Sequence, residues 1–286
     1  MKIASYFHEG TEALGQVDAD AGTVTAFDLD QAEVAAGLAG LITRETLPAC
    51  TGAPLALDAV RLAAPLRGAH QRVFCVGKNY YDHVQETEAP ELRGKVAPPE
   101  LPVIFSKLPQ SIIGPGAPIR YDPEVSVNID YEVELTAIIG VAGRNIPAGR
   151  ALSHVWGYTI LNDVTARDVQ KRHNQWLLGK SQDTFCPIGP WVVTADEIDP
   201  ANCVVSTHVN GEERQRASTA LMIHDLPSII ATVSNGITLQ AGDLIATGTP
   251  AGVGLGFTPP KFLTAGDVVS CAIEGIGVLE NPVQKW

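Results

Sequence analysis

The stretch Ile129-Asp130-Tyr131-Glu132-Val133-Glu134-Leu135 decides how the rest of the chain is organised. Its acids alternate with larger, mostly apolar residues. Because side chains of a strand point alternately to its two faces, Asp130, Glu132 and Glu134 would share one face. Like charges on one face repel each other, and a bound cation is the simplest way to turn this repulsion into attraction. The stretch predicts a strand that carries metal ligands, with a solvated edge strand as the alternative.

Composition limits the class of protein. The chain has 286 residues, of which 45% are hydrophobic and 18% charged, which is typical of a globular protein with a full core. Its formal net charge of −12 argues against nucleic acid and anionic membranes as partners. We find neither a membrane-length apolar run nor a signal-type segment, and therefore expect a cytoplasmic protein. The five cysteines form no CxxC pair and indicate free thiols.

Two units are expected along the chain. Residues 1–68 predict a small accessory α/β domain, in which strands are followed by an alanine-rich helix over Gln31–Leu41. Residues 69–286 predict a catalytic domain rich in strands, which favours an α+β fold that is mainly β. The polar, proline-rich stretch from Thr87 to Pro102 is typical of a lid. We expect this lid and the N-terminal domain to form the pocket for the substrate's side chain.

The candidate metal ligands are Glu132, Glu134 and Asp163, the last of which follows an expected strand over Trp156–Leu161. Their hard oxygen atoms favour Mg²⁺, Mn²⁺ or, as in a crystal, Ca²⁺ over zinc. Three carboxylates fill half of an octahedron, so water or substrate must complete it, as a catalytic site requires. Asp130 is assigned to a supporting role, in which it accepts a hydrogen bond from an Arg or Lys.

Two further stretches carry candidate catalytic residues. His83 and Glu86 would face the same way on a helix that Asn79 can cap, and a carboxylate that fixes one imidazole nitrogen leaves the other to take a proton from water. A surface His–Glu pair without a function is the alternative. Lys180, in Gly179-Lys180-Ser181, would hold a substrate oxygen or, as the alternative, form an ion pair with one of the acids.

A glycine-rich turn runs from Thr247 through Gly248 and Thr249 to Gly254, directly after an expected strand. Such a turn can point successive N–H groups and the Thr249 hydroxyl at a carboxylate. It is neither a Walker loop nor a dinucleotide fingerprint, and a turn without a ligand is the alternative.

Taken together, these stretches resemble the fumarylacetoacetate hydrolase superfamily, in its hydroxymuconate-isomerase-like branch. The matching pieces follow the family's order over about residues 70–283. They are Val76-Gly77-Lys78-Asn79-Tyr80 with His83 and Glu86, Asp130 to Leu135, Gly157-Tyr158 through Asp163 to Asp168, Trp176 to Pro187, and Thr247 to Gly254.

The resemblance implies a mixed β-sandwich roll, usually dimeric, with Mg²⁺ or Mn²⁺ on Glu132, Glu134 and Asp163. It assigns His83 and Glu86 to the activation of water on a lid that orders over the substrate, and it gives Lys180 a substrate contact. At Lys78 many relatives carry Arg or a smaller residue. The substrate-binding residues that we expect are Lys78, Tyr80, Lys107, Arg167, Asp168, Gly248 and Thr249.

The family resemblance also implies the chemistry. The expected partner is a small 2-oxo or 2,4-dioxo carboxylic acid that reacts through a metal-bound enolate. Hydrolytic carbon–carbon cleavage of an acylpyruvate-type substrate is the favoured reaction, because both dyad residues are present. The alternatives are oxaloacetate decarboxylation and the keto–enol tautomerisation or isomerisation of a 2-oxo dicarboxylic acid. An alternative of another class is a metal-stabilised binding protein without catalysis.

Overall fold

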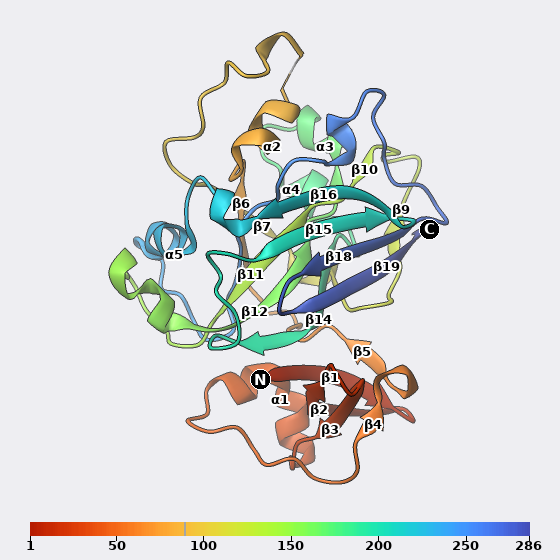
Figure 1. Ribbon diagram of the computed structural model, residues 1–286, viewed down its shortest axis with the longest axis vertical. Coiled ribbons are helices and arrows are strands. Elements are labelled where there is room, and N and C mark those ends of the chain that lie inside the picture. The colour runs from red at the N-terminus through yellow and green to blue at the C-terminus, as the bar shows by residue number, and fades with distance from the viewer. Residues whose placement is uncertain (89) are drawn as a thin grey trace.

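Strands dominate the computed structural model, which describes residues 1–88 and 90–286 (Figure 1). The largest sheet has 12 strands. In spatial order its main path is β4 (Leu55–Ala56), β3 (Thr23–Ala26), β2 (Thr11–Asp18), β1 (Lys2–His8), β14 (Cys186–Thr194), β12 (Val155–Asn162), β11 (Val133–Ile139), β17 (Leu244–Ala246), β6 (Val73–Gly77) and β7 (Val103–Lys107). Off this path, β5 (Arg61–Ala63) pairs with β1 and β8 (Ile112–Ile113) pairs with β14.

A second sheet faces the middle of the first. Its five strands are β16 (Glu212–Ser218), β15 (Val204–Val209), β18 (Val268–Ile273), β19 (Gly277–Lys285) and β9 (Ile119–Tyr121). β15, β18 and β19 contact β11, β12 and β14, and one apolar core fills the space between them. β11 is buried along its whole length, whereas β18 alternates between buried and half-buried residues because its outer face meets solvent. The expected mainly β sandwich is therefore confirmed.

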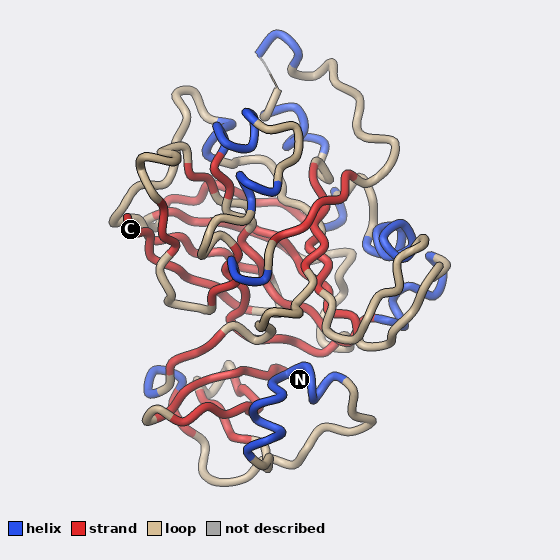
Figure 2. The backbone as a smooth tube through the Cα atoms, turned by 180° about the vertical axis from the view of Figure 1, so that it is seen from behind, coloured by secondary structure: helices blue, strands red, loops and turns tan. Residues whose placement is uncertain are grey.

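Helices are short and lie at the periphery, as Figure 2 shows. They are α1 (Gln31–Ile42), α2 (Tyr81–Glu86), α3 (Arg167–Arg172), α4 (Leu177–Lys180) and α5 (Leu226–Ser234), with 3₁₀ turns at Leu57–Ala59, Pro90–Leu92, Pro109–Ser111, Ala148–His154, Thr219–Leu221 and Gly254–Gly256. Asn79 does not cap α2, because its side chain instead bonds the backbone of His224 and Thr247. None of the helices in the described ranges is both long and apolar enough to span a membrane.

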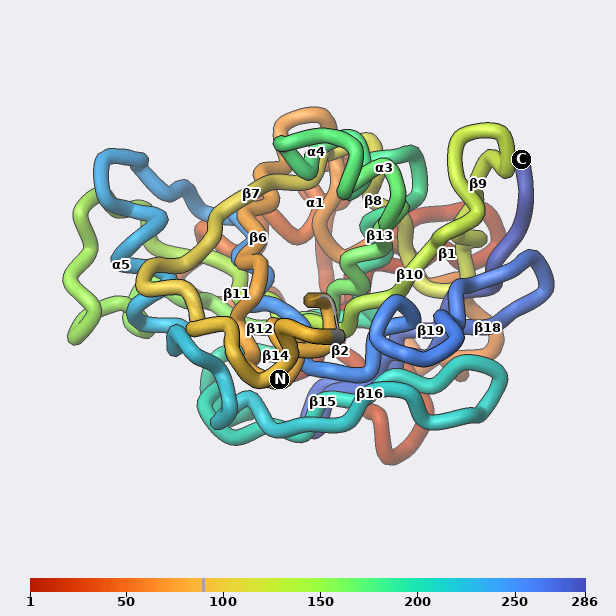
Figure 3. The backbone as a smooth tube through the Cα atoms, turned by 90° about the horizontal axis from the view of Figure 1, so that it is seen from above, coloured from red at the N-terminus to blue at the C-terminus, as the bar shows by residue number. Residues whose placement is uncertain are grey.

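The N-terminal residues form a lobe at one end of the molecule, drawn in red and orange in Figure 1. This lobe contains β1 to β5 and α1, and it is joined to the larger part by hydrogen-bonded pairing of β1 with β14 at Lys2↔Val193. The short two-stranded sheet of β10 (Ile129–Asp130) and β13 (Thr165–Ala166) lies near the opposite end, together with α2, α3 and α4. Figure 3 looks onto that end.

The expected lid is an excursion at this same end, and residue 89 of it lies outside the described residues. Side chains of Gln85 and His224 hydrogen-bond to the backbone of this expected lid. The Gln85 amide donates to Val96 O over 2.8 Å and accepts from Gly94 N over 2.6 Å. Farther along, a ring nitrogen of His224 lies 3.1 Å from Pro99 O.

Candidate active site

The acidic stretch is not one continuous strand, which corrects the sequence-based expectation. β10 ends at Asp130 and β11 begins at Val133, so Tyr131 and Glu132 lie at a break between them. Side chains from elsewhere bind the backbone at this break. Glu132 N donates to the Asn162 side chain over 2.9 Å, and Val133 N donates to Gln215 Oε1 over 3.2 Å.

Strand pairing brings the three predicted metal ligands together. β11 and β12 are antiparallel with Val133 opposite Asn162, so the residue after β12, Asp163, comes to lie beside Glu132. Asp163 N donates to Glu132 O over 2.8 Å. Ligand oxygens of Glu132, Glu134 and Asp163 all lie within 4.8 Å of one another, and all three residues are buried. The structure thus contains a buried acidic triad that could bind a metal ion.

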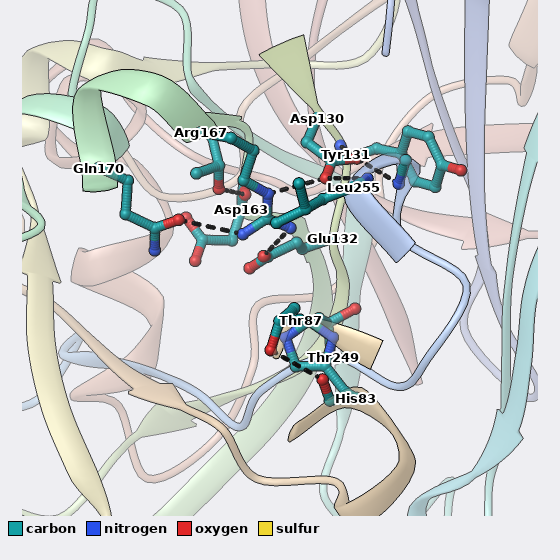
Figure 4. Close-up of polar contacts among 12 residues, drawn as sticks. His83, Thr87, Asp130, Tyr131, Glu132, Asp163, Arg167, Gln170, Thr249 and Leu255 are labelled. Atoms are coloured by element: carbon teal, nitrogen blue, oxygen red, sulfur yellow. Dashed lines mark hydrogen bonds and ion pairs between the residues drawn. The ribbon is translucent and has the colours of Figure 1, made fainter. Parts of the chain in front are cut away.

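Three buried cations surround these acids. The Lys180 ammonium bridges Glu132 Oε2, at 2.6 Å, and Asp163 Oδ2, at 2.5 Å. Lys107 donates to the other Asp163 oxygen over 2.5 Å. Arg167 donates from Nε to Asp130 over 2.7 Å, and its Nη2 forms an ion pair with Glu132 at 2.6 Å (Figure 4). The predicted supporting role of Asp130 therefore has a matching geometry.

Charge balance shows that a cation fits this cluster. It contains four carboxylates and three cations, namely Asp130, Glu132, Glu134, Asp163, Lys107, Arg167 and Lys180. Burial raises the pKa of Glu132, but Lys180 and Arg167 outweigh burial and hold that pKa well below its ordinary value. Glu134 has no ion-pair partner among the described residues. Burial, and then Asp163 and Glu132, raise its pKa well above its ordinary value. A divalent ion would supply the missing positive charge.

The His–Glu pair forms as predicted. α2 carries both residues, and His83 Nδ1 lies 2.8 Å from Glu86 Oε1. Both side chains are largely buried and line the same cavity as Glu132 and Glu134. In the view of Figure 4, His83 and Thr249 lie on one side of Glu132, and Arg167 and Gln170 on the other.

The glycine-rich turn serves the protein's own carboxylates, which differs from the expected role. Gly248 N donates to Glu134 over 2.9 Å, Gly252 N to Glu86 over 2.8 Å and Gly254 N to Asp130 over 2.6 Å. These three N–H groups therefore already donate to carboxylates of the protein and are not available to a ligand. The Thr249 hydroxyl accepts from Gln215 Nε2 over 2.8 Å, so its own proton remains available to a ligand in the cavity.

A cavity of about 590 Å³ joins most of the predicted site residues. Its lining includes Lys78, His83, Glu86, Glu132, Glu134, Arg167, Asp168, Lys180 and Thr249. Asp163, Tyr80, Lys107 and Gly248 do not line it. Asp163 lies behind Glu132 and Lys180, and the cavity gives no support to the predicted substrate contacts of Tyr80, Lys107 and Gly248. Lys107 is instead a buried partner of Asp163, and Tyr80 is buried at the start of α2. No residue of 1–68 lines the cavity either, since that lobe lies at the other end of the molecule.

Sequence reasoning missed several residues of the site. Gln170, whose side chain accepts from Arg167 over 3.2 Å, lines the cavity together with Arg93, Trp176 and Phe262. Gln215 is fully buried and bonds Val133, Thr249 and Thr207. No local motif marks Gln215, because two of its partners, Val133 and Thr249, lie 82 and 34 residues away in the sequence. The other residues of β16 are exposed or half-buried, so only the tertiary structure shows that Gln215 is buried.

Fold and site together define an enzyme of the fumarylacetoacetate hydrolase superfamily, which confirms the resemblance seen in the motifs. The chain belongs to the family described as fumarylacetoacetate (FAA) hydrolase C-terminal, whose model matches residues 72–284.

Individual relatives are similar over most of their length. The chain is 47% identical to oxaloacetate tautomerase YisK of Bacillus subtilis over 228 residues, which are 79% of this chain and 74% of the relative. It is 43% identical to mitochondrial oxaloacetate tautomerase FAHD2A of Homo sapiens over 264 residues, 91% of this chain and 79% of the relative. The solved fumarylacetoacetate hydrolase of Exiguobacterium antarcticum matches over 100% of both chains, with a TM-score of 0.85 and 44% identity.

Proposed function

We propose that this protein is a divalent-metal-dependent tautomerase that interconverts the keto and enol forms of a short 2-oxo dicarboxylic acid such as oxaloacetate. The observation that carries the proposal is that the His83–Glu86 pair lines one cavity with Glu132 and Glu134, so a proton-transfer group faces candidate metal ligands. The names of relatives at 43–47% identity support the substrate class. The sequence motifs favour hydrolysis, with tautomerisation as an alternative, whereas the names of the relatives favour tautomerisation.

The triad Glu132, Glu134 and Asp163 would hold Mg²⁺ or Mn²⁺. When bound, the ion acts as a Lewis acid that polarises the 2-oxo group. Thr249 donates its hydroxyl proton to a substrate carboxylate, because Gln215 occupies its acceptor side. Lys78 also lines the cavity, and its half-exposed ammonium, which pairs with Glu88 at 3.1 Å, would exchange that partner for the second carboxylate.

Proton transfer falls to His83. Enolisation removes one proton from C3 and places one on the oxygen at C2, so protons balance. Since the Glu86 carboxylate accepts from Nδ1, the Nε2 lone pair is free to take the C3 proton. The Lys180 ammonium, on the same cavity wall, stabilises the negative charge that develops on the C2 oxygen. His83 then returns its proton to that oxygen through water.

The test is an assay of metal-depleted protein reloaded with Mg²⁺ or Mn²⁺. Oxaloacetate is added in one tautomeric form, the enol is followed by ultraviolet absorbance, and pyruvate is measured separately. We expect faster equilibration than in buffer with the carbon skeleton intact. Release of pyruvate at the same rate would make decarboxylation the reaction, and no acceleration with either ion would refute the proposal.

Hydrolytic cleavage of an acylpyruvate is the second candidate. The same dyad can activate water, the cavity of about 590 Å³ has room for a longer acid, and a solved structure at 44% identity bears the name of a hydrolase. Incubation with an acylpyruvate should then release pyruvate and a carboxylic acid. An intact acylpyruvate beside active oxaloacetate turnover would exclude it.

A homodimer is also proposed. Exposed apolar side chains on β7 and the neighbouring α4 support it, since Ile104 is 38% and Leu178 56% exposed and β7 is an edge strand of its sheet. Light scattering of the purified protein tests this proposal. The cytoplasmic location stays a prediction; the human relative is described as mitochondrial.

A further inference from the structure

The Glu86 carboxylate is held at both oxygens. Oε1 meets His83 Nδ1 at 2.8 Å, and Oε2 accepts from Gly252 N over 2.8 Å. Gly256 packs so closely that a Cβ there would lie 2.2 Å from Oε2. Because Oε2 is held by Gly252 N, the carboxylate group cannot rotate freely. The glycine-rich loop therefore sets the orientation of the carboxylate plane relative to the His83 imidazole.

Gly252 itself has a conformation that needs support. Its φ of +105° lies in the region that favours glycine, and a Cβ there would lie 1.9 Å from Arg214 O. Its carbonyl accepts from the Tyr131 hydroxyl over 3.0 Å. Both backbone polar groups of this one residue are therefore held, the N–H by Glu86 and the carbonyl by Tyr131.

Tyr131 cannot act on a substrate directly. The residue is fully buried, is not part of the cavity lining, and lies at the break just before Glu132. Figure 4 shows its ring directed away from the Glu132 carboxylate. Since the ring belongs to the apolar core, phenylalanine would fill the same space. What tyrosine adds is one hydroxyl, which donates to Gly252 O of the loop and also lies close to the Arg214 guanidinium.

We infer that Tyr131 is a positioning residue for the catalytic pair, an assignment that rests on the proposed proton-transfer role of His83. Three hydrogen bonds carry the effect. They run from Tyr131 Oη to Gly252 O, from Gly252 N to Glu86 Oε2, and between Glu86 Oε1 and His83 Nδ1. The strand break that presents a candidate metal ligand thereby also orients the base.

Other contacts hold the rest of the loop independently. Gly248 N is bound by Glu134, and Gly254 N and Leu255 N are bound by Asp130. Loss of the Tyr131 hydroxyl should therefore release Gly252 without detaching the loop or altering the acidic triad. Arg214, the hydroxyl's other neighbour, keeps its ion pair with Glu212 at 3.0 Å, so the predicted defect in catalysis is confined to the dyad.

The experiment compares Y131F with Y158F in the full-length protein. Tyr158 is also buried, and among the described residues its hydroxyl makes no hydrogen bond to the loop. We expect kcat for oxaloacetate tautomerisation to fall about tenfold in Y131F, because small misplacements of a catalytic group are costly. KM, Mn²⁺ affinity and the melting temperature should stay near wild type, and Y158F should keep kcat.

A double substitution separates positioning from a general structural effect. If the hydroxyl acts through Glu86, Y131F should cost nothing further in an E86A background. An equal loss in both backgrounds overturns the inference, as does an unchanged kcat in Y131F.

One readout does not depend on turnover. The ¹⁵N signals of the His83 ring report the Nδ1–H hydrogen bond, and we expect them to move in Y131F and not in Y158F. Unmoved signals refute positioning. Moved signals together with a wild type that is inactive on oxaloacetate would refute the proposed function while the positioning stands.

Discussion

Two identical substitutions two residues apart should have opposite effects on the metal-free protein. Glu134 is a buried carboxylate without an ion-pair partner among the described residues, whereas Glu132 is paired with Lys180 and Arg167. E134Q replaces a carboxyl that is buried without an ion-pair partner, and that must take up a proton to be neutral, by a neutral amide that keeps an acceptor for Gly248 N, so we expect a gain of about 1–3 kcal/mol. E132Q leaves two buried cations short of an anion and should cost about 3–5 kcal/mol.

Both substitutions should abolish metal binding. For the wild type, an ion at 100 times its Kd adds about 2.7 kcal/mol, and at roughly 2–4 °C per kcal/mol the melting temperature should rise by about 5–10 °C. Neither variant should show this rise. Because the pKa of Glu134 is raised, the folded metal-free chain binds a proton that the unfolded chain has lost, so wild-type stability falls as pH increases through that interval. E134Q should lack this slope.

Thermal melts with a chelator and with Mn²⁺, together with titration calorimetry, measure all of these quantities. Two results would refute the reasoning: a full metal-induced rise in E134Q, or metal-free E134Q and E132Q shifting in the same direction. The second result would show that Glu134 is already balanced by a charge that the structure does not reveal.

Three further outcomes are expected. H83N should lower kcat about 10²- to 10⁴-fold with Mn²⁺ affinity intact, measured as deuterium exchange at C3, and unchanged exchange would remove His83 from the mechanism. K107M should destabilise the fold by about 3–5 kcal/mol, because it leaves the buried Asp163 oxygen Oδ1 without its cation and Lys180 as the only remaining ion-pair partner of Asp163 among the described residues; a stable variant with only a higher KM would restore Lys107 to substrate binding. K78A should raise KM for a dicarboxylate more than for pyruvate. The melting temperature should change little, since the ion pair of Lys78 with Glu88 is half-exposed. Equal effects on both acids would count against a contact between Lys78 and the second carboxylate.

Much of the site could be predicted from the sequence because the signals for it lie within short segments. Spacing placed His83 and Glu86 on one helical turn, and the structure joins them at 2.8 Å. Oxygen-rich acids indicated a hard metal, and the triad lies within 4.8 Å. The errors occurred where partners come from afar, as with Lys107, which binds behind Asp163 rather than in the cavity.

By itself the sequence determined the mainly β class, the residues of the acidic triad and the His–Glu pair, because hydrophobic runs and side-chain chemistry are properties of short segments. Only the tertiary structure decided that the acidic strand breaks at Tyr131, that the glycine-rich turn binds the chain's own carboxylates, and that the N-terminal lobe lies away from the cavity. The physical reason is that buried donors and acceptors must be paired, and which groups pair across 100 or more residues depends on how the sheets pack.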